Sequence, residues 1–261
     1  MLPRMIRFSV LASSSKGNAT VISAGQTHIL VDAGISATRI RKGLEESGLA
    51  YAQLAGIFIT HEHTDHVCGL GILGKRGGMH LYCSRYLSRD LREAVPSAVF
   101  TYLEPGASVQ VGDITVTPFS TSHDALDPLG YVFEHSGKRL GYVTDTGRIL
   151  RGVPELLAGV DALYLESNYD ERMLANSGRP LALQQRISGN WGHLSNTQAA
   201  DFVRSIGHAG LQHLVLAHIS PECNTPDLAY ATMRRTLDEL QLPTQLVCAP
   251  MSERLDWREV V

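Results

Sequence analysis

The feature that most constrains this chain is a short segment carrying four side chains able to bind a metal ion. Residues 57–66 read Ile-Phe-Ile-Thr-His-Glu-His-Thr-Asp-His, so an apolar run leads directly into the motif. Neutral imidazole nitrogens and carboxylate oxygens are ligands that divalent transition metals accept. In extended backbone His61 and His63 lie on the same side, and Asp65 with His66 can turn toward a second ion. Burying these groups without an ion would be costly, so the motif predicts a dinuclear metal site.

Length and composition are those of one large soluble domain. The chain has 261 residues, of which 44% are hydrophobic and 19% charged. Since no linker, composition shift or internal repeat divides it, we expect a single domain over residues 1–261. No segment approaches the roughly 20 apolar residues that span a bilayer. The segment Met1–Arg7 has no apolar stretch followed by a cleavage site, so we expect a cytoplasmic protein with no membrane partner.

Cysteine usage and charge narrow the functional classes further. The four cysteines are widely spaced and form no Cys-x-x-Cys pair, which predicts reduced thiols rather than a disulfide framework. The net charge of −3 provides no global basic field of the kind that marks bulk nucleic-acid binders. It says little about an enzyme whose metal ions supply positive charge locally.

The hydrophobic pattern predicts an α/β chain, with short strands in the first half and a more regular strand–helix alternation in the second. Ser195 and Gln198 form a capping-box signature at the start of one helix. Two β-rich halves with helices outside predict a four-layer αββα sandwich. The predicted strands are 6–11, 19–23, 28–31, 57–60, 80–83, 108–111, 114–119, 131–135, 139–144, 162–166, 213–217 and, as the last, 244–248. The predicted helices are 38–47, 84–94, 195–206 and 225–240.

One loop rarely supplies a whole dinuclear site, and three further candidate ligands follow predicted strands. His123, Asp145 and His218 each stand at or just beyond the end of a strand, where a lone polar residue is usually structural. Together with the first motif they complete a consistent set, with water or hydroxide between the ions. One ion is assigned to His61, His63, His123 and Asp145, and the other to Asp65, His66, Asp145 and His218.

The order of these ligands resembles that of the metallo-β-lactamase superfamily. More narrowly, the chain is similar from end to end to the YycJ/WalJ family. The segments that carry this likeness are 11–19, 31–34, 123–125, 144–147, 166–170 and 192–196. The family resemblance implies a metal-dependent exonuclease that degrades duplex DNA from its 5′ end in connection with mismatch repair, with DNA-repair proteins as partners. Two positions depart from the family pattern: Ser14 replaces a glycine, and Tyr169 stands where histidine is common.

Further site residues surround the predicted ligands. Asp32 is expected to orient the metal loop by hydrogen bonding rather than to bind metal. His193 resembles the histidine of a Gly-His-x-Ser element that contacts the scissile phosphate in related nucleases, and we favour such a role over a structural one. The turn 13–18 offers hydroxyls and backbone N–H groups to an anion, although an ordinary tight turn explains it equally well. The candidate phosphate-binding residues are Ser13, Ser15, Asn18, Asn168, Ser195 and Asn196.

The predicted activity is that of a phosphodiesterase with two divalent ions, Zn²⁺ or Mn²⁺. Water activated by the ions would attack phosphorus, Asp65 would ligate and orient the nucleophile, and His193 would contact the phosphate or leaving group. DNA is favoured as the substrate, most specifically duplex DNA in the 5′-to-3′ direction. An RNA-processing nuclease, a small-molecule cyclic phosphodiesterase and a metal-stabilised regulatory scaffold are the alternatives. The sequence leaves the oligomeric state open, a homo-oligomer included.

Overall fold

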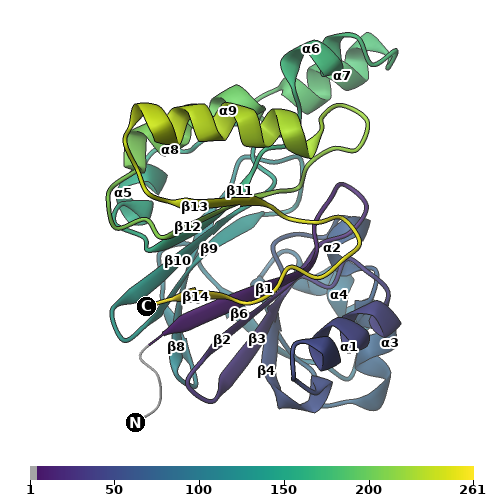
Figure 1. The fold of residues 1–261 in the computed structure, drawn as a ribbon. Helices are drawn as coiled ribbons and strands as arrows, with labels where there is room; N and C mark the ends of the chain where they lie inside the picture. The colour runs from purple at the N-terminus through teal and green to yellow at the C-terminus, as the bar shows by residue number, and fades with distance from the viewer. Residues whose placement is uncertain (1–4) are drawn as a thin grey trace.

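The computed structural model describes residues 5–261 and consists of two β-sheets packed face to face with helices on both outer sides (Figure 1). This arrangement confirms the predicted αββα architecture. A sheet hydrophobic on both faces needs a layer on each side, and the second sheet and the outer helices provide them. Within the described residues, no helix is both long enough and apolar enough to cross a membrane.

The first sheet has seven strands in the order β14-β1-β2-β3-β4-β5-β6. The strands β14, β1, β2 and β3 pair antiparallel, and β3 to β6 pair parallel. Their bounds are Ile6–Ala12, Ala19–Ala24, Thr27–Val31, Leu54–Phe58, His80–Ser84 and Val99–Leu103 for β1 to β6, and Arg258–Val260 for β14.

The second sheet has seven strands in the order β13-β12-β11-β10-β9-β8-β7. Here β7 to β10 are antiparallel and β10 to β13 are parallel. Their bounds are Val109–Val111, Ile114–Ser120, Leu129–His135, Lys138–Val143, Ala162–Glu166, His213–Ala217 and Gln245–Cys248.

Apolar side chains from both sheets form the central core. Phe58 of β4 stacks on Tyr82 of β5, with ring centroids 4.4 Å apart, and meets Tyr131 and Phe133 of the other sheet edge to face. Separate apolar clusters lie under the helices on each outer face. The strands are therefore buried on both faces, which explains their nearly continuous hydrophobic runs.

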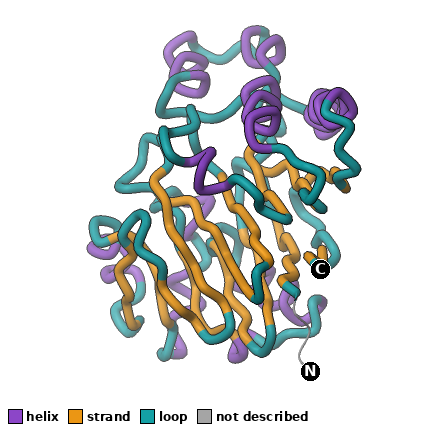
Figure 2. Tube along the Cα trace, turned by 90° about the vertical axis from the view of Figure 1, so that its left-hand side faces the viewer, coloured by secondary structure: helices purple, strands orange, loops and turns teal. Residues whose placement is uncertain are grey.

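The helices cover the outer faces, and two short ones project from the body (Figures 1 and 2). The helices α6 and α7 stand away from the sheets at the top of Figure 1, beyond one end of α9. The α-helices α1 to α9 are Ala37–Glu46, Thr64–Val67, Leu70–Leu73, Ser88–Ala94, Val153–Leu157, Glu171–Ala175, Leu181–Ser188, Asn196–Ile206 and Pro226–Glu239, and the 3-10 helices are Tyr51–Gln53 and Gly74–Arg76.

Most predicted elements are confirmed, although several details differ; the strand expected at 57–60, for example, is Leu54–Phe58. The helix expected from residue 84 begins at Ser88, because Ser84 remains in β5 and pairs with Leu103 of β6. The strand at 244–248 is not the last one, because β14 follows it and pairs with β1. The capping box at Ser195 is confirmed: its hydroxyl accepts a hydrogen bond from Gln198 N, and the Gln198 side chain accepts one from Ser195 N.

Candidate metal centre

The predicted ligands meet because the strands preceding them end at the same edge of the molecule. In the first sheet, β3 and β4 run parallel and lead to Asp32 and to the motif at 61–66. In the second, β10, β11 and β12 run parallel and lead to Asp145, Glu166 and His218. Two antiparallel steps relate β8 to β10, so His123 after β8 emerges at that edge as well. The carboxyl ends of parallel strands are where such folds place their sites.

Left-handed backbone turns three of these residues toward the centre. Asp32, Asp145 and His218 have φ angles of 60°, 52° and 52°, and the described residues contain six non-glycine residues with positive φ. Such conformations cost free energy in residues with a side chain and gather at functional sites. Asp32 and His218 directly follow β3 and β12, and Asp145 stands two residues after the end of β10, so the left-handed residues redirect the chain just beyond the strands.

The nitrogen and oxygen atoms of the predicted ligands lie close enough together to share metal ions. His123 Nε2 lies 3.3 Å from His63 Nδ1, and His218 Nε2 lies 3.3 Å from Asp65 Oδ2. Sets of donor atoms within 4.8 Å of one another comprise His61, His63 and His123; His61, His66 and Asp145; Asp65, His66 and His218; and Asp145, Glu166, His193 and His218. The first and third sets contain the members of the two predicted groups other than Asp145, which belongs to the second and fourth sets.

The position of Asp145 fits a carboxylate shared between two ions. Its Oδ2 lies 3.3 Å from His66 Nε2, while its Oδ1 lies 3.5 Å from His218 Nε2 and 3.7 Å from His123 Nε2. The buried Nε2 of His61 has no hydrogen-bond partner among the described residues. An imidazole nitrogen left unpaired inside a protein is costly unless an ion takes its lone pair. The residues present therefore fit a pair of divalent cations, and the assignment of individual ligands to each ion stays a prediction.

Buried hydrogen bonds on the side away from the other ligands orient the His66 ring. Asp32 accepts hydrogen bonds from Thr60 N and from the Thr60 hydroxyl, and its Oδ2 lies 2.8 Å from His66 Nδ1. This leaves Nε2 of His66 directed toward the other ligands, as expected of a carboxylate that fixes the ring of a metal-binding histidine. The Asn18 side chain lies 3.1 Å from His66 Nε2, and it donates to Asp65 O.

Neighbouring carboxylates keep two of the histidines protonated when no metal is bound. Burial by itself lowers the pKa of His218, but Asp145 and other carboxylates outweigh it and raise the pKa to about 10. Burial likewise opposes a charge on His66, whose pKa is nevertheless raised well above its ordinary value by Asp32 first and Asp145 next. Metal ions must therefore displace protons from both imidazoles near neutral pH.

We expect metal uptake by chelator-stripped protein to release about two protons at neutral pH. Since the raised pKa values keep His66 and His218 protonated below the folded-state pKa, the apparent metal affinity should rise with pH, by about tenfold per pH unit for each proton displaced. Calorimetric titration with Zn²⁺ or Mn²⁺ in buffers of different ionisation enthalpy measures the number of protons. An affinity that does not change between about pH 6 and about pH 8 would contradict this coupling.

Glu166 is a buried site residue that the sequence patterns did not single out. Its Oε1 lies 2.7 Å from His193 Nδ1 and 3.1 Å from His218 Nδ1, and its Oε2 accepts hydrogen bonds from Thr146 N and Leu194 N. Burial raises the pKa of Glu166, but His193 and His218 outweigh it and hold the pKa below its ordinary value. Glu166 thus fixes two rings at once. The signal that could have identified Glu166 as a site residue is its place at the end of β11, within one of the segments that resemble the family.

The predicted phosphate-binding residues fall into two groups. Ser15 lines the cavity above the ligand cluster. The other five side chains are buried and are hydrogen-bonded within the protein. Ser195 caps α8, and Asn196 pairs with Ser167 and Asn224. Ser13 accepts a hydrogen bond from His218 N. Asn18 and Asn168 contact His66 and His218 respectively, so these two support ligands.

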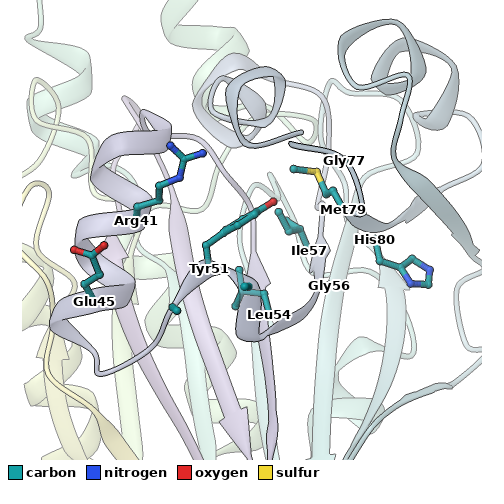
Figure 3. Close-up of a pocket in the computed structure, with 12 residues that line it drawn as sticks. Arg41, Glu45, Tyr51, Leu54, Gly56, Ile57, Gly77, Met79 and His80 are labelled. Carbon is teal, nitrogen blue, oxygen red and sulfur yellow. The ribbon is translucent and has the colours of Figure 1, made fainter. Parts of the chain in front are cut away.

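The cavity at the ligand cluster is small, polar and open. It has a volume of about 160 Å³ and is lined by Ser15, His63, Asp65, His123, Asp124, Asp145, Arg186, Ile187, Gly192, His193 and His218. A larger cavity of about 430 Å³ is lined in part by Leu54, Gly56 and Ile57 of β4 (Figure 3). The metal motif lies outside this lining, after the end of β4. In Figure 3, Tyr51 reaches across that cavity toward Ile57, and Arg41 stands above it. The smaller cavity, with its convergent titratable groups, is the candidate site.

Comparison with known proteins agrees with this geometry. Residues 27–219 match the model of the beta-lactamase superfamily domain. The chain is 34% identical over 247 residues to the exodeoxyribonuclease WalJ of Streptococcus pneumoniae, covering 90% of each chain. It is 31% identical over 237 residues to the exodeoxyribonuclease YycJ of Bacillus anthracis, again covering 90% of each.

Solved structures share the architecture at low sequence identity. The metallo-β-lactamase fold protein YhfI of Bacillus subtilis superposes with a TM-score of 0.73 at 14% identity, covering 96% of this chain and 99% of that one. The sequence matches and the shared fold lead to one conclusion. The chain belongs to the metallo-β-lactamase superfamily and, within it, to the YycJ/WalJ family.

Proposed function

We propose that this protein is a metal-dependent exodeoxyribonuclease that degrades duplex DNA from its 5′ end with two divalent ions, Zn²⁺ or Mn²⁺. The observation that carries the proposal is the overlap of two His/carboxylate clusters on Asp145, with a Glu166–His193 pair at the same cavity. The relatives that align with 90% of this chain are exodeoxyribonucleases. Structural sites seldom leave coordination positions open, so an accessible cavity over the ligands favours an enzyme over a scaffold.

When bound, the ions would lower the pKa of a water molecule and neutralise charge on the phosphate oxygens. Asp65, at the cavity wall, would accept a hydrogen bond from that water and orient it toward phosphorus. The Nδ1–H of His193 would donate a hydrogen bond to Glu166 Oε1, which lies 2.7 Å from Nδ1 and fixes the ring. The opposite nitrogen, Nε2, would then be available to a phosphate oxygen or to the leaving oxygen. Cleavage would leave a 3′-hydroxyl on one fragment and a 5′-phosphate on the other.

Several finer features stay predictions. These are the cytoplasmic location, a role in mismatch repair with DNA-repair proteins as partners, the identity of the metal, and a single domain over residues 1–261. A ribonuclease is the second candidate, since the chain is 28% identical over 176 residues to the ribonuclease Z of Gemmatimonas aurantiaca. That match covers 59% of this chain, against 90% for the exodeoxyribonucleases. The wider match favours DNA.

A strand-resolved nuclease assay tests the proposal. Chelator-stripped protein, reloaded with Mn²⁺ or Zn²⁺, would be incubated with duplex DNA labelled at either end, with duplex RNA of the same sequence, and with closed circular DNA. We expect metal-dependent release of the 5′ label before the 3′ label, no cleavage of the circle, and no activity in stripped protein. Cleavage of RNA alone would transfer the proposal to a ribonuclease. Cutting of the circle would replace the exonuclease with an endonuclease.

A further inference from the structure

An exposed tryptophan stands next to the candidate site. Trp191 is 61% exposed, and the two residues that follow it, Gly192 and His193, line the cavity. The other tryptophan of the chain, Trp257, is covered: the Arg7 guanidinium lies 4.3 Å from its ring centre, and its indole N–H donates to Ser47 O. An indole left in water forfeits a large burial free energy. An exposed indole one residue before two residues that line the cavity therefore points to a ligand surface.

The backbone that carries Trp191 is fixed on both sides. Trp191 O accepts a hydrogen bond from Asp124 N at 3.0 Å, and Asn190 O accepts one from the Ser122 hydroxyl at 2.8 Å. Both partners belong to the loop after β8 that carries His123. The 189–192 loop is thus tied directly to the ligand loop, while Trp191 itself is 61% exposed.

Glycines allow this loop to pack more closely than any side chain would permit. A Cβ atom on Gly192 would lie 2.1 Å from Ile187 O, and one on Gly147 would lie 2.2 Å from Gly189 O. Because both approaches are to backbone atoms, a small rotation of a side chain cannot relieve them. The loop is a rigid platform, so a planar ligand stacking on Trp191 would lose little conformational entropy from the protein.

A guanidinium faces the same cavity from α7. Arg186 lines the cavity, its side chain is 61% exposed, and its Nε donates to Asp124. A guanidinium has five N–H donors, and in the described residues the recorded hydrogen bonds of Arg186 use Nε alone. The Arg186 guanidinium therefore stands at the same cavity as a ligand cluster suited to phosphate chemistry.

We propose that Trp191 and Arg186 form a subsite for the terminal nucleotide of a DNA strand. The indole stacks on the base, and the guanidinium binds the terminal 5′-phosphate. Stacking on an aromatic ring tolerates every base, as a non-specific exonuclease requires. The inference rests on the proposed function and adds the group by which a strand end is recognised.

Fluorescence of Trp191 tests stacking directly. In a Trp257→Phe background the protein contains one tryptophan, since the chain has two. Metal-loaded protein would be titrated with a duplex whose terminal linkages are phosphorothioates that resist hydrolysis, and with closed circular DNA. We expect the linear duplex to quench the fluorescence in proportion to the concentration of ends, and the circle to have little effect. Quenching that follows DNA length rather than ends, or an unchanged signal upon binding, would overturn the subsite.

Steady-state kinetics separates binding of the strand end from chemistry. Trp191→Ala should raise the KM for duplex DNA on the order of tenfold or more, with a smaller change in kcat, and Trp191→Phe should restore most of the loss. Arg186→Gln should raise the KM for 5′-phosphorylated ends on the order of tenfold and should bring it close to the KM for 5′-hydroxyl ends. Metal content and thermal unfolding report whether the fold is intact.

The failures of the two proposals are distinguishable. If the wild-type protein degrades no DNA, the proposed function fails, and the subsite fails with it. If the wild type degrades DNA while Trp191→Ala has an unchanged KM, only the subsite is wrong. A loss in Trp191→Ala that appears in kcat and metal content, and that phenylalanine does not restore, would assign Trp191 a structural role and also overturn the inference.

Discussion

Replacing Asp65 by alanine should lower the rate of DNA hydrolysis by about three orders of magnitude or more, which corresponds to several kcal/mol of lost transition-state stabilisation. Asp65 Oδ2 lies 3.3 Å from His218 Nε2 and 3.5 Å from His66 Nε2, in the middle of one candidate ligand set. The carboxylate lines the cavity, and its side chain remains 23% exposed. Removing it deprives the site of a ligand and of the group that orients water, while the strands that carry the site lose no core contact.

Glu62 provides the matched control on the same loop. Its carboxylate is half-buried and accepts hydrogen bonds from Leu126 N, and it belongs to none of the donor sets. We expect Glu62→Ala to retain activity within a few-fold, because surface hydrogen bonds contribute about 1 kcal/mol. Initial rates on end-labelled duplex, together with metal content, measure both variants. Near-wild-type turnover in Asp65→Ala would rule out the proposed ligand and orienting role of this carboxylate.

Replacing Asp32 by alanine should reduce the free energy of unfolding by about 3–5 kcal/mol, the usual loss when one partner of a buried ion pair is removed. The Asp32 side chain is fully buried, and so is that of His66, whose Nδ1 lies 2.8 Å from it. Alanine would leave the Thr60 backbone N–H without its carboxylate acceptor, and His66 Nδ1 would keep only the Thr60 hydroxyl, 3.1 Å away, as a partner. It would also have to adopt the left-handed φ of 60°.

Asparagine separates the hydrogen bonds from the charge at this position. Asp32→Asn retains an acceptor for Thr60 N and tolerates left-handed backbone well, so its loss of stability should be clearly smaller than that of alanine. Both variants should bind metal on the order of 10- to 100-fold more weakly, because His66 is no longer fixed by a carboxylate. Urea unfolding of the stripped proteins and metal titration give the two quantities. A stripped Asp32→Ala protein as stable as the wild type would contradict the buried ion pair.

The metal motif and the strand ends could be predicted because their signals are local. Burial on both faces gives β4, β10, β11 and β12 short apolar runs, and a histidine or an acidic residue stands at or shortly after the end of each. One such residue is usually structural, but the whole set fits metal binding. The helices α8 and α9 could also be predicted, since capping residues stand at their starts and an apolar periodicity follows. The short helices α6 and α7 were not predicted: Asp170 caps α6, but α6 has five residues with one buried, and α7 has no side-chain cap and no buried residue.

The sequence could not decide the role of Glu166, and it allowed two roles for Ser195, a helix cap and a phosphate contact. Both belong to segments that resemble the family pattern, yet Glu166 fixes two histidines while Ser195 caps a helix with its side chain buried. Which side of a loop faces a cavity depends on how residues far apart in the chain pack around it. The pairing of Arg186 with Asp124 joins positions separated by 62 residues, and no local pattern encodes such a contact.

The sequence by itself determined the chemistry of this protein: which imidazoles and carboxylates are available, the strand ends from which they project, and the family to which their order belongs. The tertiary structure alone decided which polar groups reach the cavity, which support the ligands from behind, and that an exposed Trp191 stands beside them. The physical reason is that periodicity and capping are fixed by residues a few positions apart. The direction of a side chain at a loop is instead fixed by sheet pairing and close backbone packing between distant segments.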